Sequence, residues 1–292
     1  MNQAYSECHA HIALDGLDYK KMKALHNETP CIDIIHKNLK AYKNANISFI
    51  RDGGDKWGVS KLAKSIAKEY DIDFRSPIYA IYKEGYYGSI LGEAFSDMKD
   101  YKRLVKRVHD NNGDFIKIMA SGIMDFNEYG KITPSGLSKK ELKDMVKIAH
   151  DMGLSVMAHT NGATEISNAI EARVDSIEHG FFMENESVFA LKEEKIVWIP
   201  TYTPVANLLS EDKFNHEIIN RILELHKANI IHAIAQNVNL GLGSDAGSFP
   251  VPHAKGTISE YAYLSSICQN SEKLNQILKK TETLVKIKFM RN

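Results

Sequence analysis

Short apolar segments rich in β-formers alternate with longer segments of helical periodicity along most of the chain. Several of the short segments end in turn-forming residues, such as Gly53 and Gly54 after Asp52, or Gly122 after Ser121. Apolar runs bounded by turn residues are typical of strands. We therefore predict strands over residues 4–12, 47–52, 73–81, 115–120, 154–159, 174–179, 197–201 and 239–244.

The segments between these strands carry helix start and stop signals. Thr29 followed by Pro30 is typical of an N-cap with proline at the first helical position. Ser138 and Glu141 have the spacing of a capping box, and Gly153 is the expected end of that helix. Further helical patterns cover residues 99–109, 163–172, 186–194, 216–236 and 258–267.

Eight strands that alternate with about eight helices predict an α/β fold, a (β/α)8 TIM barrel, whose usual size is about 250 residues. A doubly wound open sheet shows the same alternation and is the alternative. No proline-rich or serine-rich linker divides the sequence, and no internal repeat stands out. We therefore expect residues 1–292 to form a single domain.

Composition and charge exclude several classes of function. The 292 residues are 43% apolar and 25% charged, which argues against a disordered, collagen-like or coiled-coil chain. Basic and acidic residues number 37 each, so the chain lacks the basic surplus that nucleic acids or anionic membranes attract. No apolar run approaches the roughly 18 residues of a membrane-spanning helix. We expect no nucleic-acid partner and no membrane partner.

The cysteines and the N-terminal residues bear on the compartment. Cys8, Cys31 and Cys268 are widely spaced and form no CxxC pair, which argues against a disulfide framework and against a cysteine zinc site. The first residues do not have the basic and then apolar pattern of a secretory signal. These features predict a cytoplasmic protein. Neither a P-loop, a GxGxxG nor a GxSxG motif supports nucleotide-dependent or serine-hydrolase chemistry.

Polar residues lie at the ends of several predicted strands. His9 and His11 are two residues apart in an extended segment, so their side chains point to the same face. Lys117 interrupts an apolar segment, where an unpaired ammonium would cost several kcal/mol. In a barrel, the C-terminal ends of the strands converge at one mouth, where such residues form a divalent-metal site. The predicted site consists of His9, His11, Lys117, His159, His179 and Asp245.

This ordered set of residues resembles the metal-dependent amidohydrolase superfamily. Residues 51–54, 115–118 and 121–122, which read Arg-Asp-Gly-Gly, Phe-Ile-Lys-Ile and Ser-Gly, are similar to the branch of imidazolonepropionase-like proteins and zinc dipeptidases or carboxypeptidases. The similarity extends from residue 5 to about residue 260. Members of that branch usually carry a flanking β-sandwich. Only eight residues precede His9, and the tail after Ile267 is short and lysine-rich, so we expect the barrel without the sandwich.

The resemblance implies a binuclear centre with two divalent ions, zinc being the expected metal. It implies His9, His11 and Asp245 as ligands of one ion, and His159 with His179 as ligands of the other. Lys117, carboxylated by CO2 to a carbamate, would bridge the two ions. The apolar surroundings of Lys117 favour the neutral amine that reacts with CO2. An unmodified lysine beside a single metal is the alternative.

The implied reaction is hydrolysis of an amide C–N bond in a small molecule, a dipeptide or an N-acyl amino acid being favoured. A hydroxide that bridges the metals would attack the carbonyl carbon, with Asp245 as general base and then general acid. One alternative is a one-metal hydrolase of cyclic amides or imidazolones, or a deaminase. Another is a catalytically inactive barrel that binds metal or ligand. The sequence leaves a homo-oligomer open.

Three further residues are candidate substrate contacts. Arg51, together with Asp52, can bind a substrate carboxylate, although a mutual ion pair fits equally well. Tyr202, just past the seventh predicted strand, is either a substrate contact or a packing residue. His253 either contacts substrate or supports the metal ligands. The glycine-flanked segment 85–88 is interpreted as a surface loop, with part of a lid as the alternative.

Overall fold

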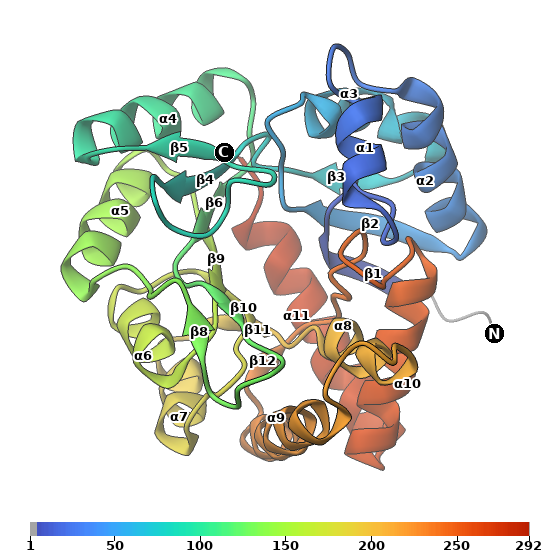
Figure 1. The fold of residues 1–292 in the computed structure, drawn as a ribbon, viewed down its shortest axis with the longest axis vertical. Helices are drawn as coiled ribbons and strands as arrows, with labels where there is room; N and C mark the ends of the chain where they lie inside the picture. Colours follow the sequence, from blue (N-terminus) through green and yellow to red (C-terminus); the bar gives the residue numbers. More distant parts are fainter. Residues whose placement is uncertain (1–4, 292) are drawn as a thin grey trace.

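Parallel strands occupy the centre of the molecule and helices surround them (Figure 1). The computed structural model describes residues 5–291, so residue 4 of the first predicted strand lies outside the described residues. The strands are β1 (Tyr5–Ala10), β2 (Ile47–Asp52), β3 (Asp73–Arg75), β4 (Ala80–Lys83), β5 (Glu93–Phe95), β6 (Ile116–Met119), β7 (Ile123–Met124), β8 (Ile132–Thr133), β9 (Val156–Thr160), β10 (Ser176–His179), β11 (Val197–Ile199) and β12 (Asn239–Leu240). The helices are α1 (Tyr19–Leu25), α2 (Ile32–Asn44), α3 (Val59–Ile66), α4 (Met98–Asp110), α5 (Lys139–Asp151), α6 (Ala163–Glu171), α7 (Asn185–Glu193), α8 (Tyr202–Asn207), α9 (His216–Gln236), α10 (Lys255–Cys268) and α11 (Ser271–Lys288), with short 3-10 turns at η1 (Ala67–Tyr70) and η2 (Leu208–Ser210).

The described strands form two parallel sheets and one antiparallel hairpin. One sheet has the order β1-β2-β3 and the other the order β12-β11-β10-β9-β6-β4-β5, while β7 pairs with β8. Backbone hydrogen bonds join the sheets on one side, where Cys8 N donates to Leu242 O at 2.9 Å and Asp245 N donates to His9 O at 2.8 Å. On the other side, β3 and β4 share no ladder within residues 5–291. The α/β class with parallel strands is confirmed, whereas the strands do not form one closed ladder.

The predicted strand 73–81 is divided into β3 and β4. Pro77 has no N–H to donate to a ladder, and Ile78 has a φ of +63°, in the left-handed region that β-branched residues rarely adopt. Extended pairing therefore stops after β3 and resumes at β4, which pairs with β5 and β6 instead. This break lies where the two sheets separate.

The predicted capping box is confirmed, whereas the N-cap predicted at Thr29 is wrong, because α2 begins at Ile32 with Cys31 at its N-cap. Ser138 caps α5 in a capping box, in which Ser138 Oγ accepts from Glu141 N and Glu141 Oε2 accepts from Ser138 N. The helix then buries Leu142, Met145 and Ala149 against the strands. No helix within residues 5–291 combines the length and the hydropathy that a membrane span requires.

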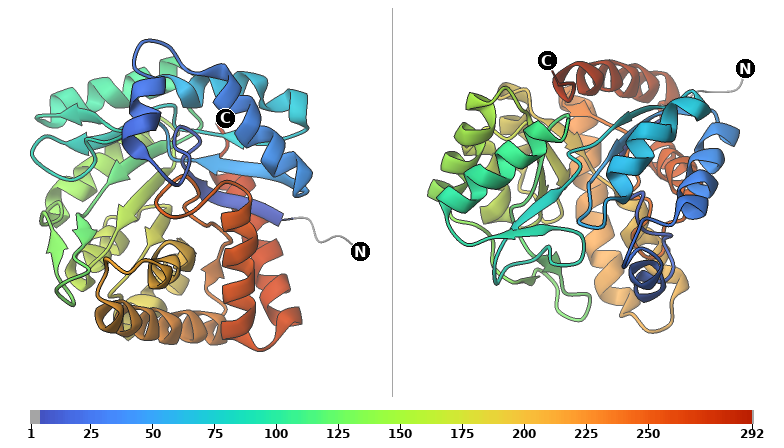
Figure 2. Two further views of the ribbon diagram at one scale, coloured as in Figure 1. Left: turned by 45° about the vertical axis from the view of Figure 1, so that its right-hand side comes forward. Right: turned by 90° about the horizontal axis from the view of Figure 1, so that it is seen from above.

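The lysine-rich tail forms helix α11, which the sequence analysis did not predict. Val285 in α11 and Phe289 just after it join an inner apolar cluster with Cys8, Phe49, Phe115, Met157, Val197 and Ile199. Ser155, which precedes β9, donates to Lys288 O, so α11 lies against the N-terminal ends of the strands. Figure 2 shows α11 on the side opposite to α1. The helix closes that end and leaves the C-terminal strand ends for the site.

Candidate metal centre

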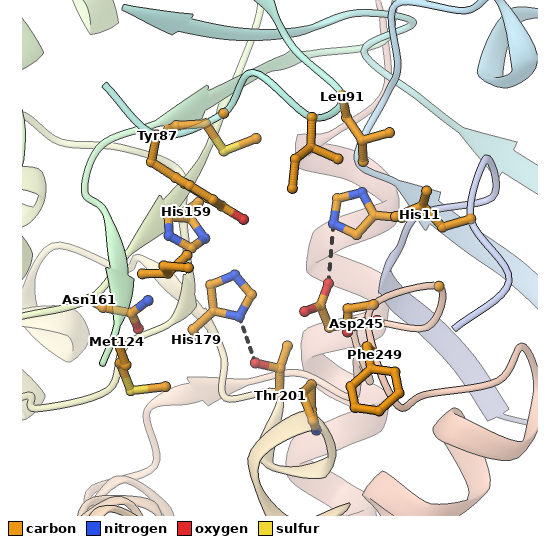
Figure 3. Close-up of a pocket in the computed structure, with 18 of the residues that line it drawn as sticks. His11, Tyr87, Leu91, Met124, His159, Asn161, His179, Thr201, Asp245 and Phe249 are labelled. Atoms are coloured by element: carbon orange, nitrogen blue, oxygen red, sulfur yellow. Dashed lines mark hydrogen bonds and ion pairs between the residues drawn. The ribbon is translucent and has the colours of Figure 1, made fainter. Parts of the chain in front are cut away.

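The end of β1 and the loop after β12 bring three potential metal ligands together. His9 and His11 lie on the same face of an extended segment, and the backbone hydrogen bond from Asp245 N to His9 O holds the aspartate beside them. The Nε2 atoms of His9 and His11 lie 3.3 and 3.1 Å from Asp245 Oδ1. One donor atom from each residue lies within 4.8 Å of the others. Figure 3 shows the side chains of His11 and Asp245 pointing toward each other in the lining of the cavity.

Several polar atoms of this group lack a hydrogen-bond partner. His9 Nε2, His11 Nδ1 and Asp245 Oδ1 are buried, and apart from the contacts of the two Nε2 atoms with Asp245 Oδ1 none of them has a hydrogen-bond partner among the described residues. Buried polar atoms are nearly always paired, so the group is complete only with a further binding partner. Two imidazoles and a carboxylate are ligands that zinc and other divalent ions accept. The residues present therefore fit a divalent metal ion.

His159 and His179 lie at the ends of β9 and β10 and face the same cavity. Their ring centroids are 4.6 Å apart, and the His179 ring lies 5.0 Å from that of His9. His159 Nε2 donates to Gly122 O at 3.0 Å, so the lone pair of this ring is on Nδ1. His179 Nδ1 lies 2.7 Å from Thr201 Oγ1, an interaction drawn in Figure 3. The structure thus brings both histidines to the cavity, beside the group of three ligands.

Burial favours the neutral forms of His9, His159 and His179. It lowers the pKa of His9 to about 4 and that of His159 to about 3, and the positive charge of Lys117 acts in the same direction. Burial also places the pKa of His179 well below its usual value. Burial would raise the pKa of Asp245, but the neighbouring histidines hold this pKa well below its usual range. The site therefore offers imidazole lone pairs and an ionised carboxylate.

Lys117 lies on β6 with 1% of its side chain exposed. Burial lowers the pKa of Lys117 to about 8, against the opposing charges of Glu178 and Asp245. A lysine with such a pKa is partly neutral near pH 7, unlike a lysine at the surface. A cavity of about 350 Å³ is lined by His11, Lys117, His159, His179 and Asp245, and His9 is completely buried beside them.

Arg51 does not reach this cavity, although the sequence analysis predicted it as a substrate contact. Its guanidinium is fully buried below the site, 4.3 Å from the centroid of the Phe289 ring. Arg51 Nη2 donates to both carboxylate oxygens of Glu178, at 2.8 and 2.9 Å, and Nε donates to Cys8 O at 2.7 Å. The side chain points from β2 into the inner core, so the guanidinium is not available to a substrate carboxylate.

Glu178 connects this ion pair to the metal ligands, a role that the sequence analysis missed. Glu178 Oε2 lies 2.6 Å from His9 Nδ1, which donates to it. The bond fixes the tautomer of His9 and leaves the Nε2 lone pair directed at Asp245. Burial alone would raise the pKa of Glu178, but Arg51 and His9 lower it to about 2. The signal in the sequence was a carboxylate near the end of a predicted strand, directly before His179.

The other two predicted substrate contacts also lie outside the cavity lining. His253 Nε2 donates to Leu14 O at 2.7 Å and His253 Nδ1 lies 2.9 Å from Tyr42 Oη, so both ring nitrogens are engaged. The ring of Tyr202 stacks on that of His226, with centroids 6.2 Å apart. The structure therefore gives Tyr202 a packing role, the second of its two readings, while His253 joins the backbone of Leu14 to Tyr42 through hydrogen bonds.

Two further residues shape the site: Tyr87, in the segment 85–88 for which the sequence allowed either a surface loop or part of a lid, and Gly53, which the sequence marked only as a turn residue. Tyr87 lines the cavity, with its ring centroid 4.9 Å from that of His159. Burial raises the pKa of Tyr87 to about 12, so its hydroxyl remains protonated at pH 7. A Cβ at Gly53 would lie 2.5 Å from His11 Cε1. The ring of His11 thus occupies space that only glycine leaves open.

Comparisons with known proteins agree with this geometry. The model of the amidohydrolase family matches residues 65–284, which is more than half of the chain. A curated relative, the ochratoxinase of Aspergillus niger, is 25% identical over 169 residues, which cover 56% of this chain and 35% of the relative. The chain thus spans about a third of the length of the curated relatives it matches.

Solved structures share the fold. A Xaa-Pro dipeptidase with methionine bound in its active site superposes with a TM-score of 0.75 and 19% identity, covering 98% of this chain and 75% of that chain. The ochratoxinase of A. niger superposes with a TM-score of 0.73 and 19% identity, covering 92% and 68%. At these identities the similarity concerns the fold alone.

Proposed function

This chain belongs to the amidohydrolase family, and from that premise we propose that it is a metal-dependent hydrolase that cleaves an amide C–N bond in a small molecule. The observation that carries the proposal is the convergence of unpartnered buried atoms of His9, His11 and Asp245 beside a cavity of about 350 Å³. Dipeptides and N-acyl amino acids are the first substrates to test, because the structural neighbours include a dipeptidase and an ochratoxinase.

The proposed centre holds two divalent ions, with zinc as the first candidate. His9, His11 and Asp245 would hold one ion, and His159 with His179 the other. Lys117 lies on the neighbouring strand, and its lowered pKa supports carboxylation to a bridging carbamate. When bound, the ions would supply a Lewis acid for the amide carbonyl and would lower the pKa of water toward neutrality.

The side chains of the cavity would transfer the proton, stabilise the oxyanion and orient the ligands. The imidazoles of His9 and His11 both approach Asp245 Oδ1, so we assign Asp245 Oδ2 to accept a proton from the attacking water and to return it to the leaving nitrogen. The protonated hydroxyl of Tyr87 is a hydrogen-bond donor for the developing oxyanion. Glu178 keeps His9 in the required tautomer.

We also infer that the two parallel sheets are parts of one (β/α)8 barrel of a single domain. The hydrogen bond from Cys8 N to Leu242 O spans one gap between the sheets. Asp114 N donates to Ser76 O at 2.9 Å across the other. Each gap is thus bridged by backbone contacts, which supports a barrel whose ladders are locally interrupted.

The test is an activity screen of metal-reconstituted protein, prepared with and without bicarbonate, over dipeptides, N-acyl amino acids, cyclic amides and lactones. Metal content is measured in parallel on the protein, on His11→Asn, and on His232→Asn as a matched control on α9, outside the cavity lining. We expect amide hydrolysis and two ions per chain, both reduced by His11→Asn only.

Two other outcomes would support a different function for the protein. One ion per chain with no bicarbonate effect would support the one-metal hydrolase or deaminase with an unmodified Lys117. Metal binding without turnover of any compound would support a non-catalytic metal-binding protein, and the proposed hydrolase would be abandoned.

A further inference from the structure

The mouth of the cavity is rimmed by exposed apolar side chains. Five large apolar residues that line it are more than a third exposed: Leu17, Tyr19, Ile90, Ile123 and Phe249. They come from four separate segments, namely the β1–α1 connection with the first residue of α1, the β4–β5 loop, the β7–β8 hairpin and the loop after β12. Contiguous exposed apolar surface is uncommon on soluble proteins and marks binding sites. The sequence concentrates such residues where a ligand must enter.

The wall below the rim is apolar as well. It is formed by Leu14, Leu91, Met119, Met124, Phe181 and Val205. The charged and imidazole groups of the lining are confined to the deepest, least exposed part, where the proposed metal ligands lie. Figure 3 shows this arrangement, with Phe249, Leu91 and Met124 around the histidines and Asp245. A bound molecule therefore contacts mainly apolar side chains along the wall and at the rim, together with a few uncharged polar groups such as Asn161 and Ser248.

Charge along the wall bears on the substrate. Among the described residues that line the cavity, Lys117 is the one cation, and the proposed function assigns it to the metals. Arg51, which the sequence predicted as the partner of a substrate carboxylate, is buried in an ion pair with Glu178. Lys213 lies outside the rim, with Nζ 4.3 Å from the centroid of the Phe249 ring, and is 61% exposed. Because a hydrated surface ammonium contributes little to binding, a free carboxylate held along the wall, away from the proposed ions, would lose its water without an adequate partner.

We propose that the preferred substrate is a neutral amide bearing a bulky apolar group, aromatic or branched aliphatic, that packs against the rim side chains of Ile123 and Phe249. This inference rests on the proposed amide hydrolase function and names its substrate class. It places dipeptides and N-acyl amino acids with a free carboxylate below their uncharged counterparts.

Three amides separate the effects of charge and apolar bulk. N-(2-phenylethyl)benzamide is neutral and bulky, N-benzoyl-phenylalanine is the same molecule with a carboxylate added, and N-ethylacetamide is neutral and small. With the metal-loaded protein, we expect kcat/KM for the first to exceed that for each of the others at least tenfold, since burying a phenyl group favours binding by about that factor or more. Equal or higher kcat/KM for N-benzoyl-phenylalanine would overturn the inference.

A matched pair of variants tests the rim. Ile123 and Ile231 are almost equally exposed, at 46% and 47%, but Ile231 lies on α9 outside the cavity. We expect Ile123→Ala and Phe249→Ala each to lower kcat/KM for the bulky neutral amide severalfold more than for N-ethylacetamide, and Ile231→Ala to change neither. A uniform effect on both amides would count against the rim as the specificity surface.

Binding to metal-free protein separates this inference from the proposed function. Titration calorimetry should show tighter binding of N-(2-phenylethyl)benzamide than of N-benzoyl-phenylalanine, with a negative heat-capacity change from apolar burial. If no amide is hydrolysed by the metal-loaded protein but this binding order holds, the hydrolase proposal fails and the apolar site stands. If hydrolysis occurs but the binding order is reversed, the substrate class proposed here is wrong and the hydrolase stands.

Discussion

Replacement of Arg51 by methionine removes the partner of a buried carboxylate directly behind the metal ligands. Arg51 and Glu178 both have fully buried side chains, and the guanidinium donates to Glu178, to Ser176 Oγ at 2.9 Å and to Cys8 O. Methionine keeps most of the apolar volume, so the loss is mainly electrostatic. Breaking a buried pair by removing one partner costs about 3–5 kcal/mol, because the other charge remains without compensation.

The pKa of Glu178 gives an independent magnitude. In the folded protein it is lowered from 4.5 to about 2, chiefly because Arg51 and His9 outweigh the effect of burial. At 1.36 kcal/mol per pKa unit, ionised Glu178 contributes about 3 kcal/mol to the free energy of unfolding. Because the folded pKa is depressed, this contribution is present above pH 4.5 and is lost as the pH falls through about 2. The free energy derived from the pKa of Glu178 thus lies at the lower end of the range of about 3–5 kcal/mol for breaking a buried pair.

The assay is urea unfolding of metal-free protein at pH 7, followed by circular dichroism, for Arg51→Met, Glu178→Gln and the double variant. We expect Arg51→Met to lower the free energy of unfolding by about 3 kcal/mol or more. The double variant should recover part of that loss, since no unpaired charge remains. A loss below about 1 kcal/mol for Arg51→Met, or a double variant no more stable than Arg51→Met, would refute the reasoning.

Three further predictions concern the site and its support. Asp245→Ala should lower kcat about 10²–10⁴-fold and change KM much less, as expected for a proton-transfer group; steady-state kinetics with near-normal turnover would remove Asp245 from that role. Gly53→Ala should displace the His11 ring, because its Cβ would lie 2.5 Å from Cε1, and should weaken zinc binding measured by competition with a chelator while the protein stays folded; unchanged affinity would show that the ring has room to move. Burial lowers the pKa of His226 to about 4 from 6.5, so its contribution to stability is full above pH 6.5 and is lost on acidification through pH 4, about 3 kcal/mol in all. Urea unfolding between pH 4 and 7 should show this component in the wild-type protein and not in His226→Phe; identical pH profiles would contradict it.

Several local features were predictable from the sequence because they depend on neighbouring residues. The period of two places His9 and His11 on one face, and the capping box of Ser138 and Glu141 forms as expected. Lys117 within an apolar run signalled a buried amine, and the structure buries it. Positions at strand ends were enough to gather these side chains, since parallel strands bring their C-terminal ends to the same side of a sheet.

Other features required contacts between distant parts of the chain. Arg51 has an obvious carboxylate neighbour in Asp52, yet it pairs with Glu178, 127 residues away, because β2 directs it into the inner core. The tail after Ile267 has a lysine-rich composition, and only its packing against Phe115 and Phe49 shows that Phe289 closes the end of the strands.

The sequence by itself determined which polar residues stand at the strand ends beside the cavity, and most of the secondary structure that places them, since periodicity and capping act over a few residues. The tertiary structure decided which charges are neutralised, which side chains reach the cavity, and that its rim is apolar. Those properties depend on burial and on partners far apart in the chain, and neither is encoded in local spacing.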